Sequence, residues 1–242
     1  MVTKEIDSIK ILHYDLVEST NSVALSEKNA EHLLTVVADE QTGGRGRMGR
    51  SFYSYYGGLY MSVVIDCDRL TVPYNLCTPA AAVAVREALS ENGVDNIKIK
   101  WVNDLLIDDK KICGILTEAR SEGGRLDRLV VGIGINLSRV REIGFPDEIS
   151  DKAGVALFDG DRLALASRIA KRLGELIEGD GKIILDNYRM HLARVGKDVY
   201  VTDYSDGNKK TLVKLLGIDD NCYLKVLMGD GTEKTMSSGE II

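Results

Sequence analysis

Short apolar runs bounded by polar residues and glycines predict the strands of the N-terminal part of the chain. These runs cover residues 10–14, 33–38 and 58–65. The first ends at Glu18-Ser19-Thr20-Asn21, where any of the last three residues can cap a helix that reaches about residue 29. An alanine-rich segment over 74–92 predicts a longer helix, which Gly93 ends.

Three further apolar runs follow closely in the middle of the chain and predict hairpins. They cover residues 97–101, 111–118 and 126–137 and are joined by short turns. Strands joined so tightly pair antiparallel, whereas a parallel sheet needs a crossover helix after each strand, and too few helices are available. Two helices are then predicted over 162–178 and 183–193. The pattern indicates an α+β domain with a mixed, largely antiparallel sheet.

The pattern changes after Val195-Gly196. Short apolar runs over 198–201, 211–216, 222–227 and 233–236 alternate with turn signals such as Gly229-Asp230-Gly231. They predict a small β-barrel over residues 194–242, next to a main domain over residues 1–193. None of the motifs described below falls in this barrel. We therefore expect it to be an accessory module that lies outside the ligand pocket.

Composition and charge narrow the class of protein. Of the 242 residues, 44% are hydrophobic and 28% charged, as in ordinary globular proteins. The net charge of −6 argues against nucleic acid as a partner, and no segment resembles a signal peptide or a membrane span. The four cysteines lie far apart without a CxxC pair, so neither a disulfide framework nor a zinc site is expected. A cytoplasmic protein without a membrane partner is predicted.

The segment over 43–50, Gly-Gly-Arg-Gly-Arg-Met-Gly-Arg, has a local charge opposite to that of the whole chain. Its glycines permit positive φ and expose backbone N–H groups, and its arginines supply planar donors for phosphate or carboxylate oxygens. The loop predicts an anion site, with a nucleotide phosphate as the anion, and closure over a ligand. By itself the pattern fits a flexible, solvated basic loop equally well.

Four segments in a fixed order carry a resemblance to a known family. They are residues 18–21, residues 44–50, the pair formed by Lys100-Trp101-Val102-Asn103-Asp104 with residues 110–118, and residues 132–137. Together they resemble the biotin protein ligases, over nearly the whole chain. The chain departs from the family pattern at Val102, where proline is usual, at Phe52, where tryptophan is usual, and near residues 153–157. No helix-turn-helix precedes Ile11, so the form without the DNA-binding domain is indicated.

The resemblance implies a fold, an activity and ligands. The fold would be a catalytic domain of the class II synthetase and biotin ligase type, followed by an SH3-like barrel. The activity would join the biotin carboxylate to the α-phosphate of ATP, release pyrophosphate, and transfer biotin from biotinyl-5′-AMP to a lysine of a biotin carboxyl carrier protein. ATP, biotin and Mg²⁺ are implied, with the metal ligands undetermined.

Positions that match the family's motifs imply the residues of the site. Polar side chains would surround the ureido ring, and these are Ser19, Thr20, Asn21 and Gln41. Charged side chains would perform catalysis, and these are Lys111, Arg45, Arg47 and Asp104. Other implied binding residues are Gly43, Gly44, Gly46, Arg50, Phe52, Trp101, Asn103, Gly114, Gly132 and Asn136.

The resemblance also gives several of these residues a role. Phe52 would stack on adenine, and Asn136 would reach the nucleotide phosphates or the metal. Gly114 and Gly132 would leave room for the biotin rings and the adenylate. Asp104 would orient the acceptor lysine, take its proton, or hold Mg²⁺ through water.

Simpler interpretations stand beside these roles. Ser19 and Thr20 are also suited to helix capping, Lys111 to a solvated turn, and Asp104 to a turn after Asn103. Trp101 suits either the core or the pocket wall. A lipoate ligase of the same fold and a sensor without enzymatic activity remain alternatives, although the Arg-Arg-x-x-Gly-Gly-Gly run of lipoate ligases is absent. The strand over 126–137 is a candidate edge for a homodimer.

Overall fold

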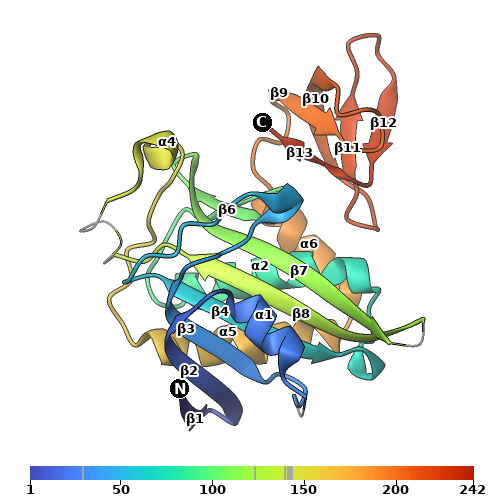
Figure 1. Ribbon diagram of the computed structural model, residues 1–242. Coiled ribbons are helices and arrows are strands. Elements are labelled where there is room, and N and C mark those ends of the chain that lie inside the picture. Colours follow the sequence, from blue (N-terminus) through green and yellow to red (C-terminus); the bar gives the residue numbers. More distant parts are fainter. Residues whose placement is uncertain (29, 123, 139, 141–143) are drawn as a thin grey trace.

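A computed structural model describes residues 1–28, 30–122, 124–138, 140 and 144–242. Its main part is an eight-stranded sheet in the order β1-β2-β3-β4-β8-β7-β6-β5 (Figure 1). The strands are β1 (Val2–Ile6), β2 (Ile9–Val17), β3 (Thr35–Gln41), β4 (Leu59–Asp66), β5 (Lys98–Lys100), β6 (Asp104–Ile107), β7 (Lys110–Glu122) and β8 (Arg125–Ile135). Strands β2 and β3 pair parallel, and the other neighbours pair antiparallel. The predicted α+β class is confirmed.

Helices cover both faces of this sheet. They are α1 (Thr20–Ser26), α2 (Cys77–Ser90), α5 (Arg162–Ile177) and α6 (Gly181–His191). The short α4 (Asp147–Ser150) and the 3-10 turns at Arg47–Gly49, Cys67–Arg69 and Tyr74–Leu76 lie in connecting segments. Alternate residues of a strand point to opposite faces. Val37 and Val63 therefore join the large core with α2, α5 and α6, whereas Val36 and Val64 join a smaller core with Ala24 of α1. Figure 1 shows α1 on one side and the three longer helices on the other.

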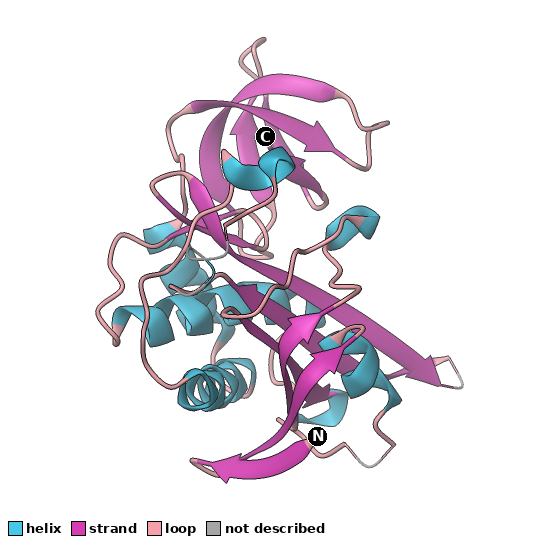
Figure 2. Cartoon of the chain, turned by 60° about the vertical axis from the view of Figure 1, so that its left-hand side comes forward, coloured by secondary structure: helices cyan, strands magenta, loops and turns pink. Residues whose placement is uncertain are grey.

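The C-terminal part is a second sheet of five antiparallel strands, in the order β12-β11-β10-β9-β13. Its strands are β9 (Asp198–Asp203), β10 (Lys210–Ile218), β11 (Leu224–Leu227), β12 (Glu233–Met236) and β13 (Gly239–Ile241). Figure 2 shows this sheet at the opposite end of the molecule from the N-terminus. Side chains from the main part reach it, because Trp101 donates to the carbonyl of Cys222 (2.8 Å) and Arg189 pairs with Asp220 (2.6 Å).

Several sequence predictions are corrected by the fold. Strand β8, predicted as an edge, lies between β4 and β7, and the outer strands are β1 and β5. Strands β1, β6 and β13 were not predicted, because the first is exposed and the other two are three or four residues long. The helix expected to reach residue 29 ends at Ser26, and residue 29 itself lies outside the described residues.

The indole of Trp101 joins the two sheets, and its loss is expected to lower stability. Trp101 is 2% exposed, and its N–H satisfies a backbone carbonyl of the smaller sheet. Trp101→Phe keeps an aromatic ring in place but leaves that carbonyl without its donor, which costs about 1–3 kcal/mol. Urea unfolding of the two proteins measures the effect. An unchanged midpoint would show that the hydrogen bond contributes nothing to the joining of the sheets.

Candidate active site

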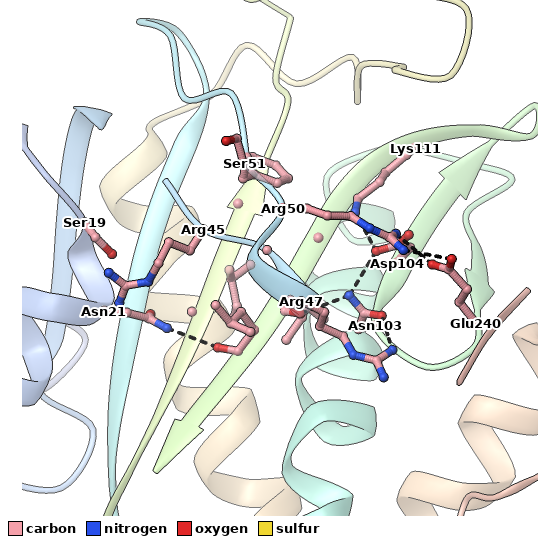
Figure 3. Close-up of a pocket in the computed structure, with 18 of the residues that line it drawn as sticks. Ser19, Asn21, Arg45, Arg47, Arg50, Ser51, Asn103, Asp104, Lys111 and Glu240 are labelled. Carbon is pink, nitrogen blue, oxygen red and sulfur yellow. Dashed lines mark hydrogen bonds and ion pairs between the residues drawn. The ribbon is translucent and has the colours of Figure 1, made fainter. Parts of the chain in front are cut away.

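A cavity of about 150 Å³ lies on the α1 face of the large sheet, next to the second sheet. Residues from all four sequence motifs line it. Of the predicted site residues, those that line it are Ser19, Thr20, Asn21, Gln41, Arg45, Gly46, Arg47, Arg50, Phe52, Trp101, Asn103, Asp104, Lys111, Gly114 and Gly132. Figure 3 shows Ser19 and Asn21 at one end and Lys111, Asp104 and Glu240 at the other.

The first end, which we call the polar end, consists of Ser19, Thr20, Asn21 and Gln41. The oxygen of the Gln41 amide accepts from the backbone N–H (2.8 Å) and the hydroxyl (3.1 Å) of Thr20. The oxygen of the Asn21 amide accepts from Ser62 on β4 (2.6 Å), and its nitrogen donates to Glu118 on β7 (2.6 Å). These bonds fix both amides in orientation before a ligand arrives.

Ser19 occupies the N-cap position of α1 but does not cap it through its side chain. Its extended backbone (φ −156°, ψ 131°) is typical of an N-cap, and the residue is 3% exposed. No hydrogen bond from its hydroxyl is formed within the described part of the chain. The hydroxyl is thus available to a ligand, whereas the Thr20 hydroxyl already has partners in Gln41 and Ser62.

The other end, which we call the cationic end, consists of Arg47, Arg50, Lys100 and Lys111 with the carboxylates of Asp104 and Glu240. Lys111 Nζ lies 2.6 Å from Asp104 Oδ1, and Asn103 also donates to that carboxylate. Arg47 Nη1 donates to Asn103 Oδ1 (3.1 Å) and to the carbonyl of Gly239 (3.2 Å). Arg47 therefore has amide and carbonyl acceptors instead of a carboxylate.

Arg45 and Arg50 are each paired with a carboxylate. Arg45 lies beside the polar end, and its Nη2 atom is 3.2 Å from Oε2 of Glu118. Arg50 Nη1 lies 2.7 Å from Glu240 Oε2, on β13. The hydrogen bond from Arg50 holds the pKa of the Glu240 carboxyl below its ordinary value, so this group is ionised at neutral pH.

The C-terminal sheet contributes directly to the cavity, because Tyr204 and Glu240 line it. This segment, expected to be an accessory module, thus lines the cationic end, while the polar end is built from the main part. Sequence reasoning missed these two residues, as well as Lys100, Ser62 and Glu118. Glu118 stands inside a quoted motif and was within reach of the reasoning, but Glu240 is separated from Arg50 by 190 positions and gave no local signal.

The backbone of the glycine–arginine loop differs from the prediction. Gly43 N–H donates to the carbonyl of Glu18 and Gly46 N–H to the carbonyl of Arg50, so these groups are not exposed to an anion. Gly43 and Gly44 do not line the cavity. Among the four glycines, Gly49 has positive φ (71°), next to Met48 with φ 57°. The groups that this loop presents to the cavity are the side chains of Arg45, Arg47 and Arg50.

Asn136 is a structural residue, which corrects the role expected for it. It is 6% exposed and does not line the cavity. Its side-chain nitrogen donates to the carbonyl of Gly154 (3.0 Å), and its backbone N–H donates to the carbonyl of Ile112. Asn136 therefore fastens the end of β8 to the segment that follows, and its amide does not reach toward a phosphate.

Three glycines of β7 and β8 accommodate protein side chains. A Cβ atom at Gly132 would lie 2.2 Å from Asn21 Oδ1, and one at Gly134 would lie 2.5 Å from the Phe52 ring. At Gly114 it would lie 3.0 Å from both Phe52 and Lys111. Phe52, Lys111 and Asn21 lie against these glycines, and the contact expected between Gly114, Gly132 and ligand rings stays a prediction. Trp101 both lines the cavity and belongs to the core.

The cavity is small in comparison with pockets that hold small molecules. Pockets for small molecules have volumes of about 300–1,000 Å³, well above the 150 Å³ found here. Arg45, Arg47, Arg50 and Phe52 line the cavity, and all belong to the glycine-rich loop or to its continuation. Displacement of these side chains would enlarge the cavity without disturbing the sheet.

The sequence model of the Biotin/lipoate A/B protein ligase family matches residues 14–136, just over half of the chain. The chain belongs to this family. The matched residues include the polar end, the glycine–arginine loop and Lys111, whereas Tyr204 and Glu240 of the cavity lie beyond the match.

Known members of the ligase family resemble the chain to different extents. The bifunctional ligase/repressor BirA of Bacillus subtilis is 36% identical over 176 residues, which are 72% of this chain and 50% of that protein. The biotin–[acetyl-CoA-carboxylase] ligase of Paracoccus denitrificans is 26% identical over 235 residues, 93% of this chain and 96% of that protein. The chain thus spans about half the length of the BirA relatives it matches.

A solved structure extends the resemblance to the second sheet. Biotin protein ligase from Aquifex aeolicus, in complex with biotin and ATP, is 30% identical, with a TM-score of 0.79. The similarity covers 96% of this chain and 97% of that one. No helix in the described residues of the present chain is long and apolar enough to cross a membrane.

Gly132→Ala is expected to disrupt the polar end of this ligase-family cavity. The added methyl group would lie 2.2 Å from Asn21 Oδ1, so Asn21 must leave its bonds to Ser62 and Glu118. Loss of the charge-assisted bond between Asn21 and Glu118 is expected to lower the affinity for biotin by about tenfold or more. Calorimetry with biotin measures the effect, and Gly229→Ala, at a turn where a Cβ atom would meet nothing within 4 Å, is a control. Unchanged affinity would show that Asn21 plays no part in binding.

Proposed function

We propose that the chain is an ATP-dependent biotin ligase, which forms biotinyl-5′-AMP and transfers biotin to one lysine of a biotin carboxyl carrier protein. A single observation carries the proposal: one cavity joins a polar end without net charge to an end with four cations. The ureido ring of biotin, with one carbonyl and two N–H groups, suits the first end. A carboxylate that meets a triphosphate suits the second.

In the first step, an oxygen of the biotin carboxylate attacks the α-phosphorus of ATP, and the bond from that phosphorus to the β-phosphate oxygen breaks. Two anions must come together, so cations around the reacting atoms lower the barrier. Lys111 is placed for this role, because its ammonium lies between Asp104 and the face of Phe52 (5.8 Å from the ring centre). Arg47 and Arg50 supply the further charge.

In the second step, a neutral amine must attack the carbonyl carbon of the mixed anhydride, and AMP leaves. Asp104 is well placed to orient the acceptor lysine and take its proton. Its side chain is 17% exposed and faces the cavity, where Lys111 holds it. When Lys111 moves to the carboxylate and phosphate of the ligand, Asp104 is released to face the incoming amine.

The site also suits Mg²⁺ that arrives with ATP. This ion prefers one or two carboxylates together with substrate phosphates and water, over a cage made of protein alone. The described residues contain no cluster of three or more acidic, histidine or cysteine side chains that would form such a cage. Asp104 and Glu240 are the cavity carboxylates that would hold it. When bound, it would neutralise part of the triphosphate charge.

Residues 1–193 would form the catalytic domain and residues 194–242 an SH3-like domain that completes the cationic end. The five antiparallel strands over 198–241 and their short turns support this division. A homodimer that pairs strand to strand would use an outer strand such as β1 or β5, because β8 lies inside the sheet.

Incubation with ATP, Mg²⁺ and labelled biotin, followed by a carrier domain, tests the function. We expect biotin-dependent release of pyrophosphate, a mass for biotinyl-5′-AMP, and label on the carrier. A carrier domain with its acceptor lysine replaced by alanine is the control and should remain unlabelled. Activity with lipoate in place of biotin would identify a lipoate ligase, and biotin binding without pyrophosphate release would identify a sensor. Either result contradicts the proposal.

A further inference from the structure

Lys100 lines the cavity but has no part in the mechanism above. It is the last residue of β5, and in the antiparallel register its Cα lies opposite that of Asp104. The residue is half-buried, and burial lowers the pKa of its ammonium group. Asp104 and Glu240 act against this shift, while Arg194 and Lys111 add to it. Lys100 is therefore a cation at the boundary between the large sheet and the C-terminal segment.

The two carboxylates that face Lys100 are already engaged by other cations. Asp104 is held by Lys111 at 2.6 Å, and Glu240 is held by Arg50 at 2.7 Å. Within the described part of the chain, Lys100 has no carboxylate oxygen within 4 Å of its own. A partly desolvated ammonium without a counter-ion costs free energy, and an anionic ligand would remove that cost.

The charges at the cationic end are therefore unbalanced. Arg47, Arg50, Lys100 and Lys111 face Asp104 and Glu240, which leaves a formal excess of two positive charges among these six groups. Arg47 and Lys100 are the two cations that lack a carboxylate partner. An anion with at least two charges, such as pyrophosphate, matches that excess.

The geometry of phosphoryl transfer decides which phosphates of ATP lie at the cationic end. The attacking and leaving oxygens stand roughly in line on opposite sides of the phosphorus. If biotin enters from the polar end, its carboxylate approaches from that side, so the leaving group must lie on the far side. That side is bounded by Arg50, Glu240 and Lys100.

We infer that Lys100 binds the β- and γ-phosphates of ATP, which leave as pyrophosphate, while Lys111 acts at the carboxylate and the α-phosphate. This assignment rests on the proposed function and extends it, because it divides the two lysines between the two sides of the reacting phosphorus. Adenylation therefore needs both lysines, whereas transfer from biotinyl-5′-AMP, from which pyrophosphate has already left, does not need Lys100.

Lys100→Met tests the assignment, because it removes the charge and keeps most of the side chain. We expect the KM for ATP, and the KM for pyrophosphate in ATP–pyrophosphate exchange, to rise by about tenfold to a hundredfold. Biotin affinity should stay within about twofold. Transfer from supplied biotinyl-5′-AMP to the carrier should proceed at the wild-type rate, and Lys100→Arg should restore most of the pyrophosphate affinity. Lys98→Met, an exposed position on the same strand, is the matched control.

Two results would overturn the assignment. One is an unchanged KM for ATP and pyrophosphate in Lys100→Met, and the other is an equal loss in transfer from supplied biotinyl-5′-AMP, which indicates a general structural role. If Lys100→Met does not bind biotin, Lys100→Gln takes its place with the same criteria. Failure of the wild-type chain to release pyrophosphate with biotin counts against the proposed function instead, and the two failures are distinguished by that measurement.

Discussion

Replacing Lys111 by alanine is expected to slow the formation of biotinyl-5′-AMP by about a hundred- to a thousandfold. The ammonium lies at the cationic end, beside Asp104 and Phe52 and close to Gly114. Its removal leaves the repulsion between the carboxylate and the α-phosphate without the group placed to offset it. It also leaves Asp104 without its ion pair, which further disfavours the approach of an anion.

Single-turnover pyrophosphate release measures this effect separately from transfer. Lys110→Ala is the matched control, because Lys110 is the exposed neighbour on the same strand and does not line the cavity. The control should release pyrophosphate at the wild-type rate. Release at a near-normal rate by Lys111→Ala would exclude Lys111 from the adenylation step.

Replacing Arg47 by glycine is expected to leave the fold intact and to release the activated intermediate. Arg47 connects the loop to Asn103 and to the carbonyl of Gly239, and its guanidinium lies 5.9 Å from the centre of the Tyr204 ring. A loop without this side chain loses its bonds to Asn103 and Gly239, whereas Arg45 and Arg50 keep their carboxylate partners. We expect the lifetime of bound biotinyl-5′-AMP to shorten by about tenfold to a hundredfold.

Escaped biotinyl-5′-AMP reacts with lysines at random, so labelling of a bystander protein such as albumin reports the leak. Met48→Gly is the matched control, since it adds a glycine to the same loop at an exposed position with positive φ. It should give no bystander label above wild type. Tight retention of the adenylate by Arg47→Gly, without bystander label, would refute the role of this arginine in closure.

Sequence reasoning succeeded where the signal is local. Apolar periodicity predicts α2 and α5 almost to their ends, and Gly93, with φ 81°, ends the first of them as expected. The motifs brought Lys111 and Asp104 together correctly, because a tight hairpin separates them in the chain and a 2.6 Å ion pair joins them in space. Short spacing and regular strands made these contacts predictable.

The rest of the site depends on long-range contacts that no local pattern encodes. Asn136 stands in a motif, yet the segment around Gly154 binds its amide and turns it away from the cavity. Glu240 stands outside every motif and still closes the cationic end, because β13 pairs with β9 beside the loop. Residue type alone predicted the chemistry of each group, but it did not predict which tertiary partner each group would find.

The hydrogen bond from Arg47 to the carbonyl of Gly239 spans 192 positions of sequence, and this has a consequence for synthesis on the ribosome. At about 5–20 residues per second, roughly 10–40 s separate the translation of the loop from that of its acceptor. During that interval β2, α1 and β3 are joined by Ser62 and Glu118, the partners of Asn21, so the polar end can fold. The cationic end must wait for β13. The part of the site proposed to bind the biotin ring can therefore form before the part proposed to activate the biotin carboxylate.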